Sequence, residues 1–144
     1  ITNMIVDSRP KYLNIGKVRN YGVELEASYS IDQKWQANAN YSWLHMKYPV
    51  IAAPKNKAFV GISYKNNKFS ANTGLQFIYG LYTSINPETE EHAYLLWNLT
   101  AQYDFTKFLS FYVRGENLLA QKYEINLGYP MPRATFMVGI NLKF

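Results

Sequence analysis

In the stretch KWQANANYSWLHM, residues 34–46, side-chain type alternates at every step from Trp35 to Trp43. Apolar and aromatic side chains occupy alternate positions: Trp35, Ala37, Ala39, Tyr41 and Trp43. The positions between them hold polar side chains: Gln36, Asn38, Asn40 and Ser42. A period of two sends successive side chains to opposite sides of an extended chain. The stretch therefore predicts a β-strand with one apolar and one polar face.

The same alternation recurs on both sides of this strand. We expect further strands at residues 18–31, 57–65, 69–81, 94–105, 109–117 and 135–144, and a weaker one at residues 1–7. Aromatic side chains make up 17% of the 144 residues, which also favours strands. No window holds the roughly 18 uninterrupted apolar residues that a membrane-spanning helix requires. The sequence thus predicts an all-β chain of eight strands.

The expected connections alternate between short and long. Short turns fall at residues 32–33, 66–67 and 106–107, whereas long loops fall at residues 8–17, 47–56, 83–91 and 119–132. Turns of a few residues join antiparallel neighbours. Short turns at one end and long loops at the other predict an antiparallel up-and-down meander.

The period alone leaves open which face points outward. A soluble ligand-binding barrel turns its apolar face inward, whereas a membrane barrel turns it toward lipid. Here the polar face is rich in Ser, Asn, Gln and Gly, and its charged members are Glu24, Glu26, Arg114 and Glu116. The strands also reach the roughly 9 to 11 residues needed to cross a bilayer. We therefore expect a transmembrane barrel with these four charged side chains in its lumen.

The aromatic residues of the apolar face support the same orientation. They stand near strand ends, with small or aliphatic residues between them, as Ala37 and Ala39 stand between Trp35 and Trp43. Tyr and Trp rings favour the membrane–water interface. The expected lipid-facing aromatic girdle consists of Tyr21, Tyr29, Trp35, Trp43, Trp97 and Tyr103.

Composition argues against nucleic-acid binding and catalysis. The net charge is +5, but the basic residues are scattered singly and form no phosphate-binding stripe. Cysteine is absent, and His45 and His92 are the two histidines. Neither has the further converging ligands of a metal site, and no serine stands in a nucleophile elbow. We expect no enzyme, no cofactor and no metal site.

Four segments together resemble a known family. They are NIGKVRNYGVELEASYSI (residues 14–31), PKNKAFVGISY (54–64), VRGENLLAQKYE (113–124) and GYPMPRATFMVGINLKF (128–144). In order and spacing they resemble the last eight strands of TonB-dependent outer-membrane receptors. The resemblance implies that residues 1–144 are the C-terminal third of a 22-stranded barrel. The plug domain and N-terminal strands would lie elsewhere, and the start at Ile1 without a signal peptide likewise suggests a piece of a longer protein.

The resemblance implies transport across the outer membrane. Extracellular loops would capture a scarce nutrient, and TonB would act through the plug of the intact protein to release it into the periplasm. The sequence is similar to Bacteroidota receptors assigned to iron-chelate or cobalamin uptake. The alternative is a self-contained eight-stranded barrel with a structural or adhesive role, since eight strands can close a membrane barrel.

The resemblance also implies a topology, with the carboxyl terminus and short turns in the periplasm. Lysines expected at that rim are Lys34, Lys65, Lys68, Lys107 and Lys143, where they could reach phospholipid headgroups. Basic residues expected on the outer side are Arg9, Lys11, Arg19, Lys47, Lys55 and Lys57, near lipopolysaccharide phosphates. Equally, these charges could simply remain in water.

Further roles remain open between function and structure. The lumen residues Glu24, Glu26, Arg114 and Glu116 could contact the plug or form cross-strand ion pairs within the wall. Tyrosines expected in the outer loops are Tyr48, Tyr82, Tyr94, Tyr123 and Tyr129, which could touch a nutrient ligand or serve as ordinary rim residues. Gly139, Leu142 and Phe144 resemble the terminal signal read by the barrel-assembly machinery.

Overall fold

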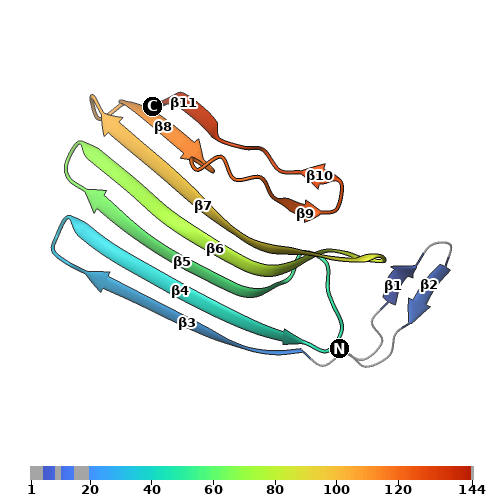
Figure 1. Cartoon of the computed structure of the whole chain (residues 1–144). Coiled ribbons are helices and arrows are strands. Elements are labelled where there is room, and N and C mark those ends of the chain that lie inside the picture. Colours follow the sequence, from blue (N-terminus) through green and yellow to red (C-terminus); the bar gives the residue numbers. More distant parts are fainter. Residues whose placement is uncertain (1–4, 9–10, 15–19, 144) are drawn as a thin grey trace.

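The computed structural model describes residues 5–8, 11–14 and 20–143, and its main element is a seven-stranded sheet (Figure 1). The strands are β3 (Asn20–Ser30), β4 (Trp35–Met46), β5 (Pro54–Lys65), β6 (Phe69–Ile85), β7 (Glu88–Asp104), β8 (Leu109–Glu116) and β11 (Thr135–Leu142). They lie in the order β3-β4-β5-β6-β7-β8-β11, and all their pairings are antiparallel. The predicted all-β, up-and-down arrangement is confirmed.

The pairing register keeps like side chains together across the sheet. Ala39 of β4 lies opposite Val60 of β5, and Val60 lies opposite Leu75 of β6. On the other side, Asn38 lies opposite Gly61, because neighbouring positions alternate between faces. The face that carries Ala39 and Val60 is called the apolar face below, and the opposite one the polar face.

Two smaller hairpins accompany the sheet. β1 (Ile5–Ser8) pairs with β2 (Lys11–Asn14), and β9 (Glu124–Asn126) pairs with β10 (Tyr129–Pro130). The described part of the expected strand at residues 1–7 therefore pairs with β2 and not with the seven-stranded sheet. β3 and β11 are the two edges of that sheet. The count of eight wall strands and the closure of a barrel stay predictions.

The three short turns are stabilised by the same local device. In each, a side-chain oxygen accepts hydrogen bonds from the backbone N–H groups two and three residues later. Asp32 Oδ1 accepts from Lys34 and Trp35 at 2.6 and 2.7 Å, Asn66 Oδ1 from Lys68 and Phe69 at 3.0 and 2.8 Å, and Thr106 Oγ1 from Phe108 and Leu109 at 3.1 and 3.0 Å. These turns lie where the sequence predicts them.

All four expected long loops contain strand residues: β2 lies within residues 8–17, and β5 begins at Pro54 within residues 47–56. The prediction of a loop at residues 83–91 is wrong, because β6 continues to Ile85 and β7 begins at Glu88. Pro87 and the polar residues after it resemble a loop in sequence, yet they form a tight turn and the start of a strand. The expected loop at residues 119–132 contains the β9–β10 hairpin. The β6–β7 hairpin therefore extends beyond the neighbouring strands (Figure 1).

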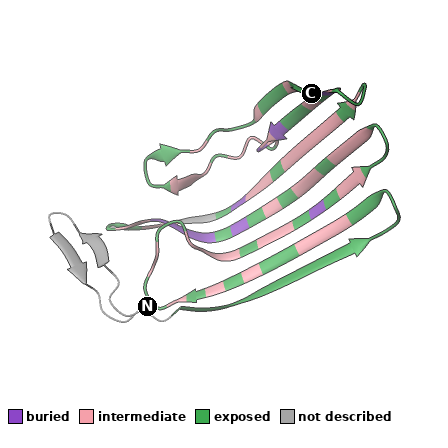
Figure 2. Cartoon of the chain, turned by 180° about the vertical axis from the view of Figure 1, so that it is seen from behind, coloured by how far each residue is buried: buried purple, intermediate pink, exposed green. Residues whose placement is uncertain are grey.

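Most of the sheet has no apolar core. Figure 2 shows buried positions gathered on the extended part of β6, while β3 is exposed along its length. Large apolar side chains of the apolar face are open, with Val60 61% and Val138 70% exposed. An apolar surface of this extent requires a cover. Within the described residues, no helix is long and apolar enough to cross a membrane.

Candidate functional site

A buried cluster joins the long hairpin to the last long loop. Ile78 and Leu81 of β6 and Tyr94 of β7 are 6%, 3% and 6% exposed. Partly buried side chains pack against them: Leu96, Tyr123 and Ile125. The rings of Tyr94 and Tyr123 stack with centroids 4.3 Å apart and planes at 23°. We call these six residues the loop-end cluster; they hold residues 117–134, the final loop, against β6 and β7.

Gly80 makes this cluster possible. Ile78 and Leu81 are three positions apart, so strict alternation would place them on opposite faces. Gly80 lies between them with φ of 69°, a left-handed conformation that glycine adopts without steric cost. A Cβ at this position would also lie 2.7 Å from Cδ of Lys55. The strand can therefore bring both side chains into one cluster.

An ion pair lies beside the cluster. Lys55 Nζ and Glu90 Oε2 are 2.8 Å apart, and the ammonium lies 4.8 Å from the ring centroid of Tyr82. The last paired residues of β4 and β5 at this end are Trp43 and Asn56, and Asn56 in turn lies opposite Tyr79 of β6. The ion pair lies beyond these residues, in the part of the sheet that extends past the β4–β5 pairing. The hydrogen bond to Glu90, followed by that to Tyr82, raises the pKa of Lys55. The pair thus adds a charged contact between β5 and β7.

Asn117 organises the final loop. Its side chain is buried, and its Nδ2 donates to the carbonyl oxygens of Gln121 at 2.9 Å and Pro132 at 3.1 Å. Its Oδ1 accepts from the N–H of Gln121 at 3.0 Å, while its own N–H donates to Asn98 Oδ1 at 2.9 Å. The Asn117 side chain therefore ties the two ends of the loop to each other, and its backbone N–H ties the loop to β7. The sequence indicated Asn117 only as part of a family motif, not for this role.

The tip of the long hairpin is held from two sides. A register shift between Tyr82 and Ser84 leaves Thr83 out of the β6–β7 pairing. The carbonyl of Thr83 instead accepts from the N–H of Leu127 at 3.0 Å, and that of Tyr82 accepts from the N–H of Ala52 at 3.0 Å. Paired backbone groups avoid the cost of burial without a partner. The two long loops thus dock on the extended strand.

A pocket of about 440 Å³ opens in the final loop. Its lining combines two cations, one carboxylate and apolar side chains: Lys122, Arg133, Glu124, Tyr123, Pro130 and Met131. Glu124 Oε2 accepts from the N–H of Gly128 at 2.8 Å, which engages that carboxylate in the β9–β10 turn. Burial and the nearby Glu116 carboxylate raise the pKa of Tyr123, which keeps its phenol neutral. This pocket can offer cations and a phenolic donor to a ligand.

The expected loop tyrosines occupy three kinds of place. Tyr82 and Tyr94 lie in β6 and β7, not in loops, and both are buried. Tyr123 lies in the final loop and is partly buried by its stack with Tyr94. Tyr48 and Tyr129 are 43% and 74% exposed. The placement of Tyr82 and Tyr94 in outer loops was therefore wrong, because the β6–β7 hairpin extends past both residues.

The expected lumen charges are not joined across strands in the part of the chain that the structure describes. Arg114 and Glu116 pair with each other along β8, with Nη2 and Oε1 2.6 Å apart, and both are largely exposed. Glu24 and Glu26 lie on the edge strand β3, opposite Ser42 and Asn40. The expected cross-strand ion pairs are thus replaced by a same-strand pair, because two neighbouring same-face positions hold opposite charges.

The expected girdle residues lie on the apolar face and are exposed. Tyr21 contacts Trp43 edge to face with ring centroids 5.8 Å apart, Trp35 lies 4.7 Å from Tyr64, and Tyr103 lies 5.0 Å from Phe105. Tyr29 is 70% exposed. Trp97 lies opposite Leu75 in the middle of the sheet, with Nε1 donating to Thr73 Oγ1 at 2.8 Å. Their contact with lipid stays a prediction.

The expected assembly signal lies on the edge strand β11. Gly139 faces Tyr112, and a Cβ added to it would lie 2.5 Å from the tyrosine ring. Glycine therefore lets that ring lie flat against the sheet. Leu142 is 61% exposed on the apolar face, and Phe144 lies outside the described residues.

The two histidines are separate in the sheet. His45 of β4 stacks on Tyr21, with ring centroids 4.6 Å apart. His92 belongs to β7, but its side chain lies outside the described part of the structure. Over residues 5–8, 11–14 and 20–143, no group of three or more acidic or histidine side chains could hold a metal ion.

Comparison with known proteins identifies relatives of this sheet. A family model described as "TonB dependent receptor-like, beta-barrel" matches residues 1–118. Comparison with curated protein sequences finds no match.

Several solved structures resemble the chain. FpvA of P. aeruginosa, solved with iron-bound pyoverdine, has a TM-score of 0.76, 21% identity and 99% coverage of this chain. The ferric-catecholate import receptor Fiu of E. coli K12 has a TM-score of 0.71 and 19% identity over 99% of this chain. The copper transporter OprC has a TM-score of 0.75 and 20% identity over 92% of this chain. The matches cover 23%, 24% and 25% of those proteins. At these identities the likeness concerns the fold, and the chain spans about a quarter of each solved relative.

Proposed function

Because the chain belongs to the family of TonB-dependent receptor β-barrels, we propose that it forms wall and outer loops of an outer-membrane importer. In the intact receptor, TonB would act through a plug domain. The cargo would be a scarce nutrient, either an iron chelate or a cobalamin-like molecule. The family match over residues 1–118 carries this proposal. The proposed function consists of ligand binding and passage across the membrane, with no catalytic step.

The proposal includes an orientation in the membrane. The apolar face meets lipid and the polar face lines the lumen. The girdle residues near strand ends lie at the two interfaces, whereas Trp97 lies at mid-height. The exposure of Val60 and Val138 supports this, since lipid would cover them. The long loops face outward near lipopolysaccharide, and the short turns face the periplasm. Gly139, Leu142 and Phe144 would address the chain to the barrel-assembly machinery.

The final loop supplies the most specific support for ligand binding. Its pocket carries Lys122 and Arg133 beside the neutral phenol of Tyr123. Cations with a hydrogen-bond donor suit an anionic chelate. The loop-end cluster and Asn117 hold this loop in one conformation, and a preformed site loses less conformational entropy on binding.

Uptake by intact cells tests the function. A strain lacking the full-length receptor should lose import of one labelled ferric chelate or corrinoid, and loss of TonB should have the same effect. Unchanged uptake across a panel of both classes would contradict the proposal.

Point variants of the receptor locate the site. Lys122→Ala with Arg133→Ala should weaken uptake on the order of tenfold or more, since charge-assisted hydrogen bonds are lost. Lys47→Ala serves as a matched control, because Lys47 is a cation of the other long loop outside this pocket. Outer-membrane levels of all variants must equal those of the wild type. Equal uptake by the paired variant and the control would exclude this pocket as the ligand site.

A further inference from the structure

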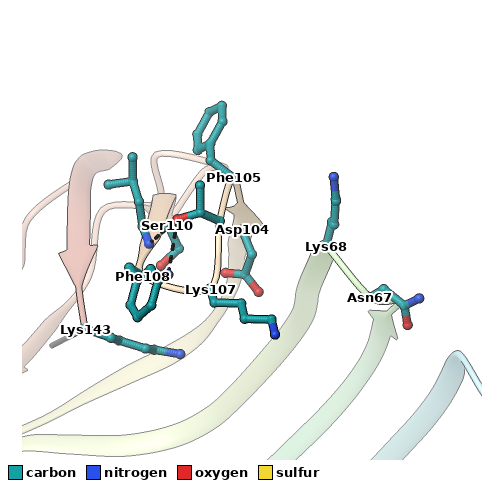
Figure 3. Close-up of a pocket in the computed structure, with 10 residues that line it drawn as sticks. Asn67, Lys68, Asp104, Phe105, Lys107, Phe108, Ser110 and Lys143 are labelled. Atoms are coloured by element: carbon teal, nitrogen blue, oxygen red, sulfur yellow. Dashed lines mark hydrogen bonds between the residues drawn. The ribbon is translucent and has the colours of Figure 1, made fainter.

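A second pocket lies at the opposite end of the sheet, among the short turns (Figure 3). It measures about 420 Å³ and is lined by the β7–β8 turn and by the adjoining ends of β6 and β11. Figure 3 shows Lys107 and Lys143 extending into the space beside Asp104. The pocket thus draws on three segments that the sheet brings together.

Positive charge in this pocket is not neutralised. Lys68, Lys107 and Lys143 line it together with a single carboxylate, that of Asp104. Asp104 Oδ1 accepts from Gln102 Nε2 at 2.8 Å, so a neighbour already uses one of its oxygens. In the described part of the chain, none of the three ammonium groups has an ion pair within 4.0 Å. Three cations against one anion favour an anionic ligand.

Ser110 adds an independent indication. It is 4% exposed, it lines the pocket, and its Oγ is buried without a hydrogen-bond partner among the described residues. Thr106, in the same turn, has its Oγ1 engaged by two backbone N–H groups. Buried hydroxyls are nearly always hydrogen-bonded, because burial without a partner costs free energy. An incoming oxyanion would give the Ser110 hydroxyl an acceptor.

The apolar side chain of Phe108 indicates which class of anion would fit this pocket. Phe108 lines the pocket and is 66% exposed, beside the lysines. Phe105 also lines it, but its ring contacts Tyr103 of the apolar face and points away from the lysines (Figure 3). An exposed ring next to cations suits a ligand that carries both a carboxylate and apolar groups. A small inorganic anion would leave Phe108 uncovered.

We propose that this pocket binds an acidic peptide segment, whose carboxylate is held by Lys107, Lys143 and Ser110 while an apolar neighbour covers Phe108. Ser110 alternates along β8 with Leu109 and Phe111, so it belongs to the polar face. The proposal rests on the proposed orientation, in which that face lines the lumen. A bilayer phospholipid would lie across the wall, against the apolar face. A peptide segment inside the lumen is the ligand that matches this geometry.

Neighbouring turns provide a matched control. Lys34 and Lys65 line another pocket at the same end of the sheet, which shares Asn67 and Lys68 with the first pocket. None of those side chains has a buried polar atom without a partner in the described structure. Comparison of the two pockets therefore separates cross-linking at a specific binding site from cross-linking of exposed lysines in general.

Zero-length carbodiimide cross-linking of the full-length receptor in native outer membranes tests the proposal. It joins a lysine amine to a carboxylate only when the two are in contact. Mass spectrometry should find Lys107 or Lys143 joined to an Asp or Glu other than Asp104, which lines the pocket itself. The peptide mass then tells whether that residue belongs to the same polypeptide or to a separate periplasmic protein. Ser110→Ala should lower the yield on the order of tenfold, since a hydrogen bond to a charged group is lost.

Two results would overturn the proposal. The first is equal cross-linking of Lys107, Lys143, Lys34 and Lys65, with no effect of Ser110→Ala. The second is a phospholipid that co-purifies in native mass spectrometry and is lost in Lys107→Gln with Lys143→Gln, which would identify a lipid phosphate as the occupant. The cross-link needs no transport, so a receptor that cross-links but imports nothing would refute only the proposed function.

Discussion

The long-loop end and the short-turn end of the sheet differ in how their polar and charged side chains are paired. At the long-loop end, Lys55 pairs with Glu90, and the buried side chain of Asn117 has partners for both oxygen and nitrogen. At the short-turn end, side-chain oxygens within the turns accept from the turn backbone, but among the described residues Ser110 Oγ has no hydrogen-bond partner and three lysines share the single carboxylate of Asp104. In the part of the chain that the structure describes, Lys55, Glu90 and Asn117 at the long-loop end are thus paired, and the pocket there presents Lys122 and Arg133 to a ligand. Over the same part of the chain, the pocket at the short-turn end instead combines lysines that form no ion pair and a buried hydroxyl that has no partner.

The largest expected loss comes from a cavity in the loop-end cluster. Leu81→Ala removes a side chain that is 3% exposed and should lower the free energy of unfolding by about 4 kcal/mol. Chemical unfolding of the full-length receptor in lipid vesicles measures this. Leu127→Ala, in the final loop at a side chain 46% exposed, is the control and should cost less than about 0.5 kcal/mol. Equal losses would show that the cluster does not hold the loop.

Asn117→Ala should have the next largest effect. It removes three side-chain hydrogen bonds in a buried place, each worth about 1 kcal/mol, so a loss of about 3 kcal/mol is expected. Limited proteolysis of the receptor in outer membranes should show earlier cleavage within residues 117–134. Asn117→Asp keeps the acceptor for Gln121 but turns a buried carboxylate oxygen toward the carbonyls of Gln121 and Pro132, so it should lose at least as much. A cleavage pattern like that of the wild type in Asn117→Ala would contradict this role.

Removal of a turn acceptor at the other end should cost less. Thr106→Ala takes away the oxygen that serves Phe108 and Leu109, both in an exposed turn, and should cost about 1 kcal/mol. Thr106→Asp retains an acceptor and should restore most of the stability. Vesicle unfolding of both variants gives the comparison. A loss of unfolding free energy as large as that of Leu81→Ala would contradict the prediction that the Thr106 side chain stabilises only its own turn.

The smallest effect concerns pH at the long-loop end. The pKa of Lys55 lies above its ordinary value of 10.5, so its stabilising effect is complete below that pH and is lost as pH rises through the folded value. The pKa of Tyr123 lies above 10.0, and its contribution disappears in the same direction. Proteolysis of the final loop should therefore accelerate above about pH 10. Glu90→Gln should cost less than about 1 kcal/mol at neutral pH, because the ion pair is partly exposed. Acceleration on acidification instead would contradict the assignment.

Side-chain periodicity predicts much of this fold but not the long-loop end. The alternation at residues 34–46 corresponds to β4, and Asp32, Asn66 and Thr106 mark the short turns. These features are local, so one segment of sequence contains their cause. Gly80, in contrast, interrupts the alternation through its positive φ, and this lets Ile78 and Leu81 contact Tyr94 of another strand. A period of two cannot reveal that contact.

Both candidate sites depend on contacts distant in sequence. The pocket of the final loop joins Lys122 with Arg133, and the opposite pocket joins Ser110 with Lys143 and Lys68. The sequence indicated the lysines as rim charges but gave no reason to select Ser110. Serine is common on the polar face, and only the three-dimensional packing shows that this hydroxyl is buried with no partner among the residues that the structure describes.

The orientation of the two faces is the central claim, and accessibility along β4 tests it most directly. The chain has no cysteine, so single substitutions Ala37→Cys, Asn38→Cys, Ala39→Cys and Asn40→Cys can each carry a spin label. In the full-length receptor in outer-membrane vesicles, labels at residues 37 and 39 should collide more with oxygen, which concentrates in lipid. Labels at residues 38 and 40 should collide more with a water-soluble relaxation agent. A reversed pattern, or no alternation, would contradict the account.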